Sequence, residues 1–414
     1  MFSVRKDVVK KYLYFDSAST TKCSEEAARE LLRFATEDFG NPSSAHIYGQ
    51  KSAHAIAEAR AFFAEQFHVE PNQVIFTSSG TESDNLAIYG STMPWFLSAT
   101  RQTIRVLASA IEHAAVRNTV ESLNAFGANI HWIPVQSDGQ IDSEKYLELL
   151  TPETSFITIQ QVNNLLGTIL PVDDLATEAK SRVRDLIFHT DAVQSFGKID
   201  VPRAGSSIDL VSLSGHKIYG PKGIGALIVL NKSLLTSHRL RPLIWGGKQE
   251  NGLRSGTQNA GLIAGFHIAA KRTLATQKLR FQKVTTLRNF LYDRLKHHSE
   301  IHWNSPIETP AVPHIVSLSF PQLPSSASAS TLAQLLETSG CIISVGSACR
   351  SKNPKPDPVL KAIGMPQRLQ NTTLRISLDA ELEKEDVETL ADSLEKALAR
   401  IARITKIKRP GREG

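Results

Sequence analysis

Three short polar segments, each next to an apolar run, contain side chains that suit one kind of chemistry. In the first, Ser214-Gly215-His216-Lys217 follows a strand expected over residues 210–212. A lysine alone is most often a solvated surface residue, but strands rarely end in this sequence for packing reasons. A lysine amine among small and hydroxyl side chains suits a Schiff base with a carbonyl compound. Lys217 is therefore a candidate catalytic residue, and Ser214 and His216 are candidate phosphate ligands.

The second segment places Asp191 at the C-terminal end of the apolar run 186–190. Ligands of open α/β sheets bind at these strand ends. The competing interpretation is that Asp191 caps a following helix. In the third segment, residues 76–82, a strand leads through a Ser/Gly loop into a helix. Backbone N–H groups and the helix dipole at such a start favour a phosphate, which Gly80 and Thr81 would contact, although such a turn is usually only a cap.

Together the three segments suggest pyridoxal phosphate. This cofactor needs a Schiff-base lysine, an acid against its ring nitrogen and an anion site. The acid keeps the ring nitrogen protonated, so that the ring can withdraw electrons from the substrate Cα. Lys217, Asp191 and Thr81 supply these three features in separate parts of the chain.

Cys349 is the candidate nucleophile. It lies among small residues and is followed by Arg350 and Lys352, a setting that predicts an exposed loop whose cations favour the thiolate. A lone cysteine can also be a small buried hydrophobe. We expect that role for Cys341, which lies inside an apolar run, and no role for Cys23.

The elements that must position these residues follow an α/β pattern. Short apolar runs alternate with longer helical patterns, which predicts a mostly parallel sheet. Strands are expected at residues 74–76, 104–108, 130–134, 155–160, 186–190, 210–212, 226–229, 315–320 and 374–377. Residues 266–298 read as a long helical connector, and 384–404 as a final helix. The interpretation is a large domain over 14–265 and a smaller α/β domain over 266–414 that includes residues 1–13.

Composition indicates a globular protein. The chain has 414 residues, 41% hydrophobic and 21% charged, which excludes a disordered or collagen-like chain. Its net charge of +6 resides in the tail from residue 396, where seven basic residues face one acidic residue. A basic tail can attract nucleic acid or an acidic partner, but cations also favour the end of a solvated helix. We prefer the second interpretation, so nucleic-acid binding is not expected.

No targeting or membrane segment is expected. The first 11 residues are charged throughout, and four prolines interrupt the uncharged stretch 309–336. Three cysteines cannot form a disulfide framework and are too scattered for a zinc ribbon, so no metal site is expected. The sequence therefore predicts a cytoplasmic protein in a reducing compartment.

The chain resembles the cysteine desulfurases, which belong to the class V aminotransferase group of fold-type-I pyridoxal-phosphate enzymes. The likeness rests on motifs in family order from Tyr14 to Arg375. These motifs are Gly40-Asn41-Pro42-Ser43-Ser44, Phe76-Thr77-Ser78-Ser79-Gly80-Thr81-Glu82-Ser83-Asp84-Asn85, Glu112-His113, Val162-Asn163-Asn164, His189-Thr190-Asp191-Ala192-Val193-Gln194, Ser214-Gly215-His216-Lys217 and Arg254-Ser255-Gly256-Thr257. The resemblance covers nearly the whole chain.

The resemblance implies a role for each matching residue. Lys217 would carry pyridoxal 5'-phosphate, and Asp191 would pair with the ring nitrogen. Gln194 would contact the ring hydroxyl, and His113 would stack on the ring and shuttle protons. The phosphate ligands would be Gly80, Thr81, Ser214 and His216.

Other implied roles concern the substrate L-cysteine and its sulfur. Asn164 and Arg375 would bind the substrate carboxylate, for which the planar Arg fork is well suited. Thr257 would reach the phosphate of the neighbouring subunit of a homodimer. Cys349 would take the sulfur as a persulfide and pass it to an acceptor protein, for which an iron–sulfur scaffold is one candidate. The other product is L-alanine.

Three departures from the family pattern bear on these expectations. Leu165 follows the paired Asn residues, where the family usually has Glu. Ala114 follows His113, where the related selenocysteine lyases tend to carry Asp. The family's scaffold-binding tail is not recognisable in residues 406–414. A selenocysteine lyase of the same fold and a non-catalytic interaction protein remain the alternatives.

Overall fold

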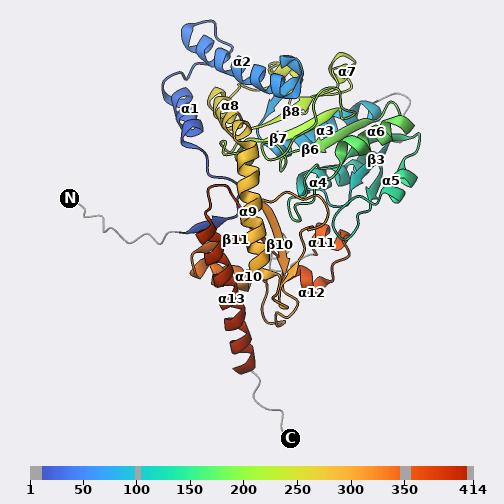
Figure 1. Ribbon diagram of the computed structural model, residues 1–414. Helices are drawn as coiled ribbons and strands as arrows, with labels where there is room; N and C mark the ends of the chain where they lie inside the picture. Colours follow the sequence, from blue (N-terminus) through green and yellow to red (C-terminus); the bar gives the residue numbers. More distant parts are fainter. Residues whose placement is uncertain (1–11, 98–103, 346–355, 408–414) are drawn as a thin grey trace, which may run out of the picture.

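The computed structural model describes residues 12–97, 104–345 and 356–407, which form two β-sheets with helices packed on them (Figure 1). The strands are β1 Leu13–Phe15, β2 Val74–Thr77, β3 Arg105–Ser109, β4 Asn129–Ile133, β5 Thr154–Thr158, β6 Ile187–Asp191, β7 Leu210–Ser214, β8 Gly225–Val229, β9 His302–Trp303, β10 Ile315–Ser319, β11 Cys341–Val345 and β12 Leu374–Ser377. The α-helices are α1 Glu25–Thr36, α2 Ile47–Phe67, α3 Gly80–Phe96, α4 Ala114–Ser122, α5 Ser143–Leu149, α6 Val172–Arg182, α7 Ser233–Thr236, α8 Ala260–Ala275, α9 Gln277–Leu295, α10 Ala329–Thr338, α11 Pro358–Ala362, α12 Gln367–Gln370 and α13 Lys384–Ile407.

The larger sheet has the strand order β2-β8-β7-β6-β5-β3-β4. Its strands are parallel from β7 to β4, and β8 runs antiparallel to both of its neighbours. Helices cover both faces, so successive residues of a central strand enter two different cores. Ile187 packs in the core that contains Leu86 of α3, and Phe188 packs in the core that contains Phe63 of α2 and Phe266 of α8.

The smaller sheet has the order β1-β11-β12-β10-β9. Only β1 and β11 pair in parallel, and the other neighbours are antiparallel. Its core joins Phe15 and Ile376 to Leu287 of α9, Leu332 of α10 and Leu390 of α13. The N-terminal strand therefore belongs to a sheet built otherwise from the last third of the chain, and the domain limits chosen from the sequence stay a prediction.

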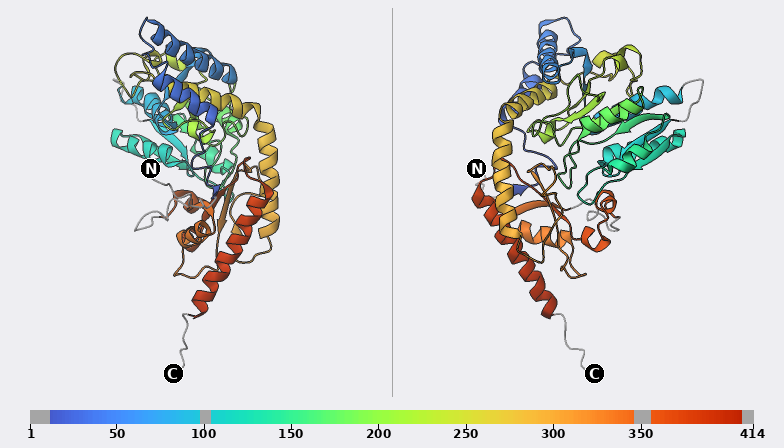
Figure 2. Two further views of the ribbon diagram at one scale, coloured as in Figure 1. Left: turned by 90° about the vertical axis from the view of Figure 1, so that its left-hand side faces the viewer. Right: turned by 45° about the vertical axis from the view of Figure 1, so that its right-hand side comes forward.

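The expected connector over 266–298 is helical, but it is divided into two helices. Thr276 lies between α8 and α9 with φ −112° and ψ 6°, outside the helical region. The helix α8 packs on α1 and α2, whereas α9 packs on α13. The two helices thus lead from the larger to the smaller sheet, as both views of Figure 2 show.

Every strand expected from the sequence overlaps an observed strand, with its ends shifted by two residues or fewer. The strands β1, β9 and β11 were not expected. Cys341 lies in β11 with no exposed surface, which confirms that this thiol is buried. None of the described helices has the length and apolar character that spanning a bilayer requires.

Candidate active site

A cavity of about 550 Å³ lies where the C-terminal ends of β6 and β7 meet the N-termini of α3 and α4. Arg375 of β12 and Ser344 and Val345 of β11 close it from the smaller sheet. The structure brings ten of the residues singled out in the sequence to this cavity: Gly80, Thr81, His113, Asn164, Asp191, Gln194, Ser214, His216, Lys217 and Arg375.

Lys217 ends the single 3₁₀ turn Gly215–Lys217 that follows β7. Its Nζ donates to the backbone oxygens of Ala18 at 2.6 Å and Ser19 at 2.7 Å. Burial, and then the positive charge of Arg375, lowers the pKa of Lys217 to about 8. A substantial fraction of the amine is therefore neutral and nucleophilic near neutral pH.

Asp191 is the last residue of β6, and its side chain is 6% exposed. No helix begins in the turn that follows, so the capping interpretation is wrong. Instead, one carboxylate oxygen accepts from the backbone N–H of Val193 at 2.8 Å. Burial raises the pKa of Asp191, while the charges of His113 and Lys217 oppose this rise. A cationic group bound in the cavity would likewise favour the ionised carboxylate.

His189 lies on the same strand, two residues before Asp191, and it has no exposed surface. Its Nδ1 lies 2.9 Å from the hydroxyl of Thr158, and its Nε2 lies 2.9 Å from the hydroxyl of Ser212. Burial lowers the pKa of His189 to about 3, so the ring is neutral. This residue therefore supports the strand end with hydrogen bonds and adds no charge.

Two further carboxyl groups, Asp84 and Glu112, line the cavity and are 1% and 2% exposed. Glu112 accepts from the backbone N–H of Gln160 at 2.7 Å. Burial, together with the negative charge of Asp191, raises the pKa of both groups well above the usual range. No role was expected for Asp84, Glu112 or His189, since nothing local in the sequence shows that these side chains meet around Asp191.

The N-terminus of α3 forms a corner that suits an anion. Ser79 caps the helix by accepting from the N–H of Glu82, and Gly80 and Thr81 line the cavity. A Cβ on Gly80 would lie only 2.7 Å from Cγ2 of Val193, so this position favours glycine. The backbone here can therefore approach a ligand closely, and the helix dipole favours negative charge.

Among the buried oxygen atoms of the cavity lining, three that belong to uncharged side chains accept or donate no hydrogen bond within the described parts of the chain. These atoms are Oγ of Ser214, Oε1 of Gln194 and Oδ1 of Asn164. Buried polar atoms normally have partners, so unsatisfied ones that face a cavity indicate a polar ligand. Ser214 is also close to the α3 corner, because its Cβ would lie 3.3 Å from a Cβ on Gly80.

Two histidines border the same space. His113 caps α4, and its Nδ1 accepts from the N–H of Ala115 at 3.1 Å. The protein around the cavity replaces water beside His113 and lowers its pKa. His216 lies 3.1 Å from the hydroxyl of Thr20, and burial lowers its pKa to about 4. Both imidazoles are therefore neutral hydrogen-bonding groups near neutral pH.

Arg375 of β12 supplies a cation to the cavity from the smaller sheet. It donates to the backbone oxygen of Asn164 at 2.9 Å, to Asp16 at 3.0 Å and to the hydroxyl of Ser19. These bonds fix the orientation of the guanidinium, and its side chain is 10% exposed. The group is thus held in place for a carboxylate that enters the cavity.

Two predicted residues are not placed in this cavity. Thr257 is exposed and lines no part of it. Cys349 lies outside the described residues. The described chain on either side of it does reach the cavity, since Val345 and Asp357 both line its wall.

Comparison with known proteins agrees with this geometry. Residues 13–390 match the model of the family described as aminotransferase class V. The chain is 34% identical over 401 residues to cysteine desulfurase IscS of Dictyoglomus turgidum, which covers 97% of this chain and 98% of the relative. It is 32% identical over 394 residues to cysteine desulfurase NifS of Azotobacter vinelandii, with 95% and 94% of the two chains covered.

A solved structure described as a NifS-like protein superimposes with a TM-score of 0.85 at 31% identity. The match covers 94% of this chain and all of the other. From the family model, the relatives and the shared fold, it follows that the chain belongs to the cysteine desulfurase family of class-V aminotransferases.

Proposed function

We propose that this protein is a pyridoxal-phosphate-dependent enzyme that converts L-cysteine to L-alanine and collects the sulfur as a persulfide on Cys349. The observation that carries the proposal is one cavity in which Lys217, whose pKa is lowered to about 8, lies with the buried acid Asp191 and an anion-favouring helix start.

The cavity residues fit the cofactor. The Ser214 hydroxyl, together with the backbone of Gly80 and Thr81, would hold the phosphate. Asp191 would face the ring nitrogen, and the unpartnered amide oxygen of Gln194 would accept from the ring hydroxyl. Burial raises the pKa of Asp191 and of the two carboxyl groups beside it, so a positively charged ring nitrogen would favour their ionised forms.

When bound, pyridoxal 5'-phosphate supplies an aldehyde for covalent attachment and a ring that accepts electrons from the substrate Cα. Lys217 provides the amine for attachment, and its Nζ then takes the proton from the substrate Cα. Because its pKa is about 8, Nζ can both accept and return a proton near neutral pH. His113 offers a second, neutral site for proton transfer beside it.

Arg375 would bind the carboxylate of L-cysteine, and the side chain of Asn164 would contact the substrate beside it. The backbone oxygen of Asn164 already orients the guanidinium. Lys217, Val345 and Asp357 line the same cavity as Arg375, so a substrate held by Arg375 would share the cavity with them.

The sulfur transfer balances with Cys349 as the nucleophile. The Cys349 thiolate forms a bond to the substrate sulfur, the substrate Cβ–S bond breaks, and its electron pair stays on the carbon, which takes up a proton. L-Alanine results, and the sulfur remains as a persulfide. In support, Cys349 follows Val345, which lines the cavity, by four residues. Four residues of extended chain reach at most about 14 Å.

Product analysis tests the proposal. The wild-type protein should release L-alanine from L-cysteine and carry a persulfide, whereas Cys349→Ser should bind the cofactor but form neither product. Cys23→Ser is the matched control, because Cys23 is a free thiol away from the cavity lining, and it should remain active. A persulfide found on Cys23 or Cys341 contradicts the assignment. Alanine formed only from L-selenocysteine would favour a selenocysteine lyase.

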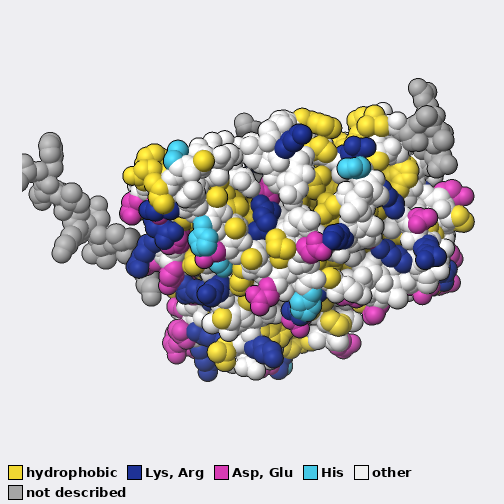
Figure 3. Space-filling view, turned by 90° about the horizontal axis from the view of Figure 1, so that it is seen from above, with side chains coloured by type: hydrophobic (Ala, Val, Ile, Leu, Met, Phe, Trp, Pro, Cys, Tyr) yellow, Lys and Arg dark blue, Asp and Glu magenta, His cyan; other side chains and the backbone are white. Residues whose placement is uncertain are grey.

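We also propose that the active form is a homodimer. Thr257 is exposed and follows Arg254, which is bound to Glu82 at the start of α3 by a 2.9 Å ion pair. Large apolar side chains are exposed as well, with Trp245 77%, Phe39 65% and Ile47 62% accessible. Hydrophobic side chains lie among charged ones on the face that carries α1 and α2 (Figure 3). Exposed apolar groups of this kind favour a protein interface.

Light scattering tests the dimer, which should have about twice the chain mass of 45.5 kDa. Activity from a monomer at assay concentration contradicts it.

The persulfide would pass to an acceptor protein for iron–sulfur cluster or thio-cofactor synthesis, because turnover requires that the thiol be regenerated. A cytoplasmic location fits the two described cysteines, which are both free thiols.

A further inference from the structure

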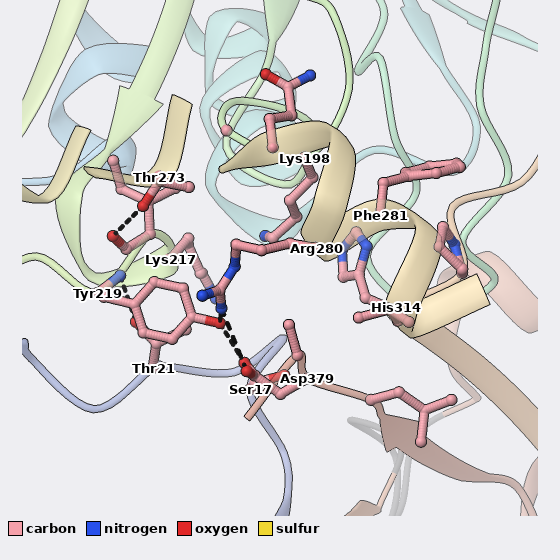
Figure 4. A pocket seen from close by; sticks show the side chains of 17 residues that line it. Ser17, Thr21, Lys198, Lys217, Tyr219, Thr273, Arg280, Phe281, His314 and Asp379 are labelled. Carbon is pink, nitrogen blue, oxygen red and sulfur yellow. Dashed lines mark hydrogen bonds and ion pairs between the residues drawn. The ribbon is translucent and has the colours of Figure 1, made fainter. Parts of the chain in front are cut away.

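A second, smaller cavity lies on the far side of Lys217, between the two sheets (Figure 4). Lys217 lines both cavities. The walls come from the turn after β6, from α8 and α9, and from the segments before β10 and after β12. The space of about 50 Å³ can hold a few water molecules or one small ion, but no amino acid.

Two buried nitrogen atoms of this cavity have no hydrogen-bond partner in the part of the chain that the structure describes. One is the buried Nζ of Lys198, and the other is the buried Nε2 of His314. His314 is 7% exposed. Figure 4 shows both side chains near Arg280. A buried ammonium without a partner is costly, so a missing ligand or loss of the proton must relieve it.

The other charged groups of the lining are already satisfied. Lys217 donates to two backbone oxygens. Arg280 pairs with Asp379 at 3.3 Å. Asp379 also accepts from the hydroxyl of Tyr219 and from the backbone N–H of Glu381. Asp379 attracts Lys198 through its charge but makes no hydrogen bond with it in the described parts of the chain, and the lining has three basic side chains, Lys198, Lys217 and Arg280, for this one carboxylate.

We propose that this cavity binds one small monovalent anion of chloride size, held by the Nζ of Lys198 and the Nε2 of His314. Lys198 follows β6 of the larger sheet, and His314 directly precedes β10 of the smaller sheet. An anion bound by both side chains therefore links the parts of the chain that form the two sheets. The inference does not depend on the proposed reaction, because it concerns neither the substrate nor Cys349.

Thermal unfolding of the holoenzyme tests the site. Melting temperatures are compared in sodium chloride, sodium bromide and sodium gluconate at equal ionic strength. Chloride and bromide should raise the melting temperature saturably, by about 1–3 °C for a chain of this size, whereas gluconate is too large for the cavity. The rise should disappear in Lys198→Met and persist in Lys278→Met, which removes an exposed lysine of α9.

Equal stabilisation by gluconate, or the same chloride effect in Lys198→Met as in the wild type, would overturn the proposal. Since Lys198→Met could fold poorly, bromide-soaked crystals of the wild-type protein give a second measurement. An anomalous peak between Lys198 and His314 supports the anion site. Density for water alone at this position, without an anomalous signal at high bromide, contradicts it.

The pH dependence separates this site from a general salt effect. Burial lowers the pKa of Lys198 to about 7, and only its ammonium form attracts an anion. Chloride stabilisation should therefore weaken as the pH rises from about 6.5 to 8.5. The titratable and charged groups that face Lys198 across the cavity are Lys217, Tyr219, Arg280, His314 and Asp379. A chloride effect that is constant over this pH range, or one that grows with pH, contradicts the site.

Discussion

The substitution Asp191→Asn separates the charge of this side chain from its structural role. Among the described residues, the side chain of Asp191 makes one hydrogen bond, in which its carboxylate accepts from the N–H of Val193 at 2.8 Å. An asparagine oxygen can accept the same bond, so the turn after β6 should stay intact. Asp191→Ala would remove this hydrogen bond and lower the free energy of unfolding by about 1–3 kcal/mol, since the Val193 N–H loses its partner.

The two variants should therefore differ in stability and agree in activity. Removing the carboxylate takes away preorganised charge opposite the ring nitrogen, an effect worth about 2.7–4 kcal/mol in comparable sites. We expect kcat/KM for alanine formation to fall by a factor of about 10²–10³ in both variants. Thermal unfolding of the cofactor-free proteins should show Asp191→Asn to be at least as stable as the wild type.

The stabilities of the wild type and of Asp191→Asn should depend differently on pH. Burial raises the pKa of Asp191 above its unfolded value of about 3.9, so the folded state holds this proton more tightly than the unfolded state. The stability that this contributes is present at low pH and is lost as the pH rises through the folded pKa. Asp191→Asn has no proton to lose at this position and keeps this stability. Its free energy of unfolding should therefore exceed that of the wild type above about pH 4 and equal it below that pH.

Two results would refute this reasoning. If Asp191→Asn kept activity within about threefold of the wild type, the charge of Asp191 would have no part in the reaction. If the cofactor-free Asn variant unfolded as readily as Asp191→Ala, the side chain would act mainly through the turn. Glu388→Gln is a matched acid-to-amide control, because this carboxylate is exposed on α13 and lies away from the cavity lining.

Three further predictions concern the same cavity. Lys217→Ala should lose covalent attachment of the cofactor, and borohydride reduction of the wild type followed by peptide mass spectrometry should label Lys217 alone; cofactor uptake by the cofactor-free protein should quicken as the pH rises through about 8, where the amine becomes neutral. Gly80→Ala should weaken cofactor binding by about tenfold or more, as measured by titration, because the new Cβ lies 2.7 Å from Val193 Cγ2; unchanged affinity would mean that Val193 moves freely. Arg375→Lys should raise the KM for L-cysteine by about 10–100-fold with a smaller change in kcat, because lysine cannot donate a planar fork; a fall in kcat alone would contradict carboxylate binding.

Gly80, Asp191 and Lys217 could be identified without a structure because their sequence signals are local. A strand followed by a Ser/Gly turn and a helix is visible around Gly80, and Asp191 and Lys217 come at or shortly after the ends of apolar runs. In a parallel sheet such strand ends meet at one edge. Family resemblance then supplied the roles of His113, Gln194 and Arg375, for which the local pattern carries no chemical signal.

Other features depend on which distant segments pack together, and this depends on tertiary structure. The placement of β1 beside β11 joins residues more than 300 positions apart. Asp84 and Glu112 come near Asp191 only because α3 packs on β6 and because the segment after β3, a strand that β5 separates from β6, reaches the same cavity. Lys198 and His314 lie in different loops, and their shared cavity exists only where the two sheets meet around α9. Burial and the absence of a partner decide the chemistry of such groups, and both are properties of the packed chain.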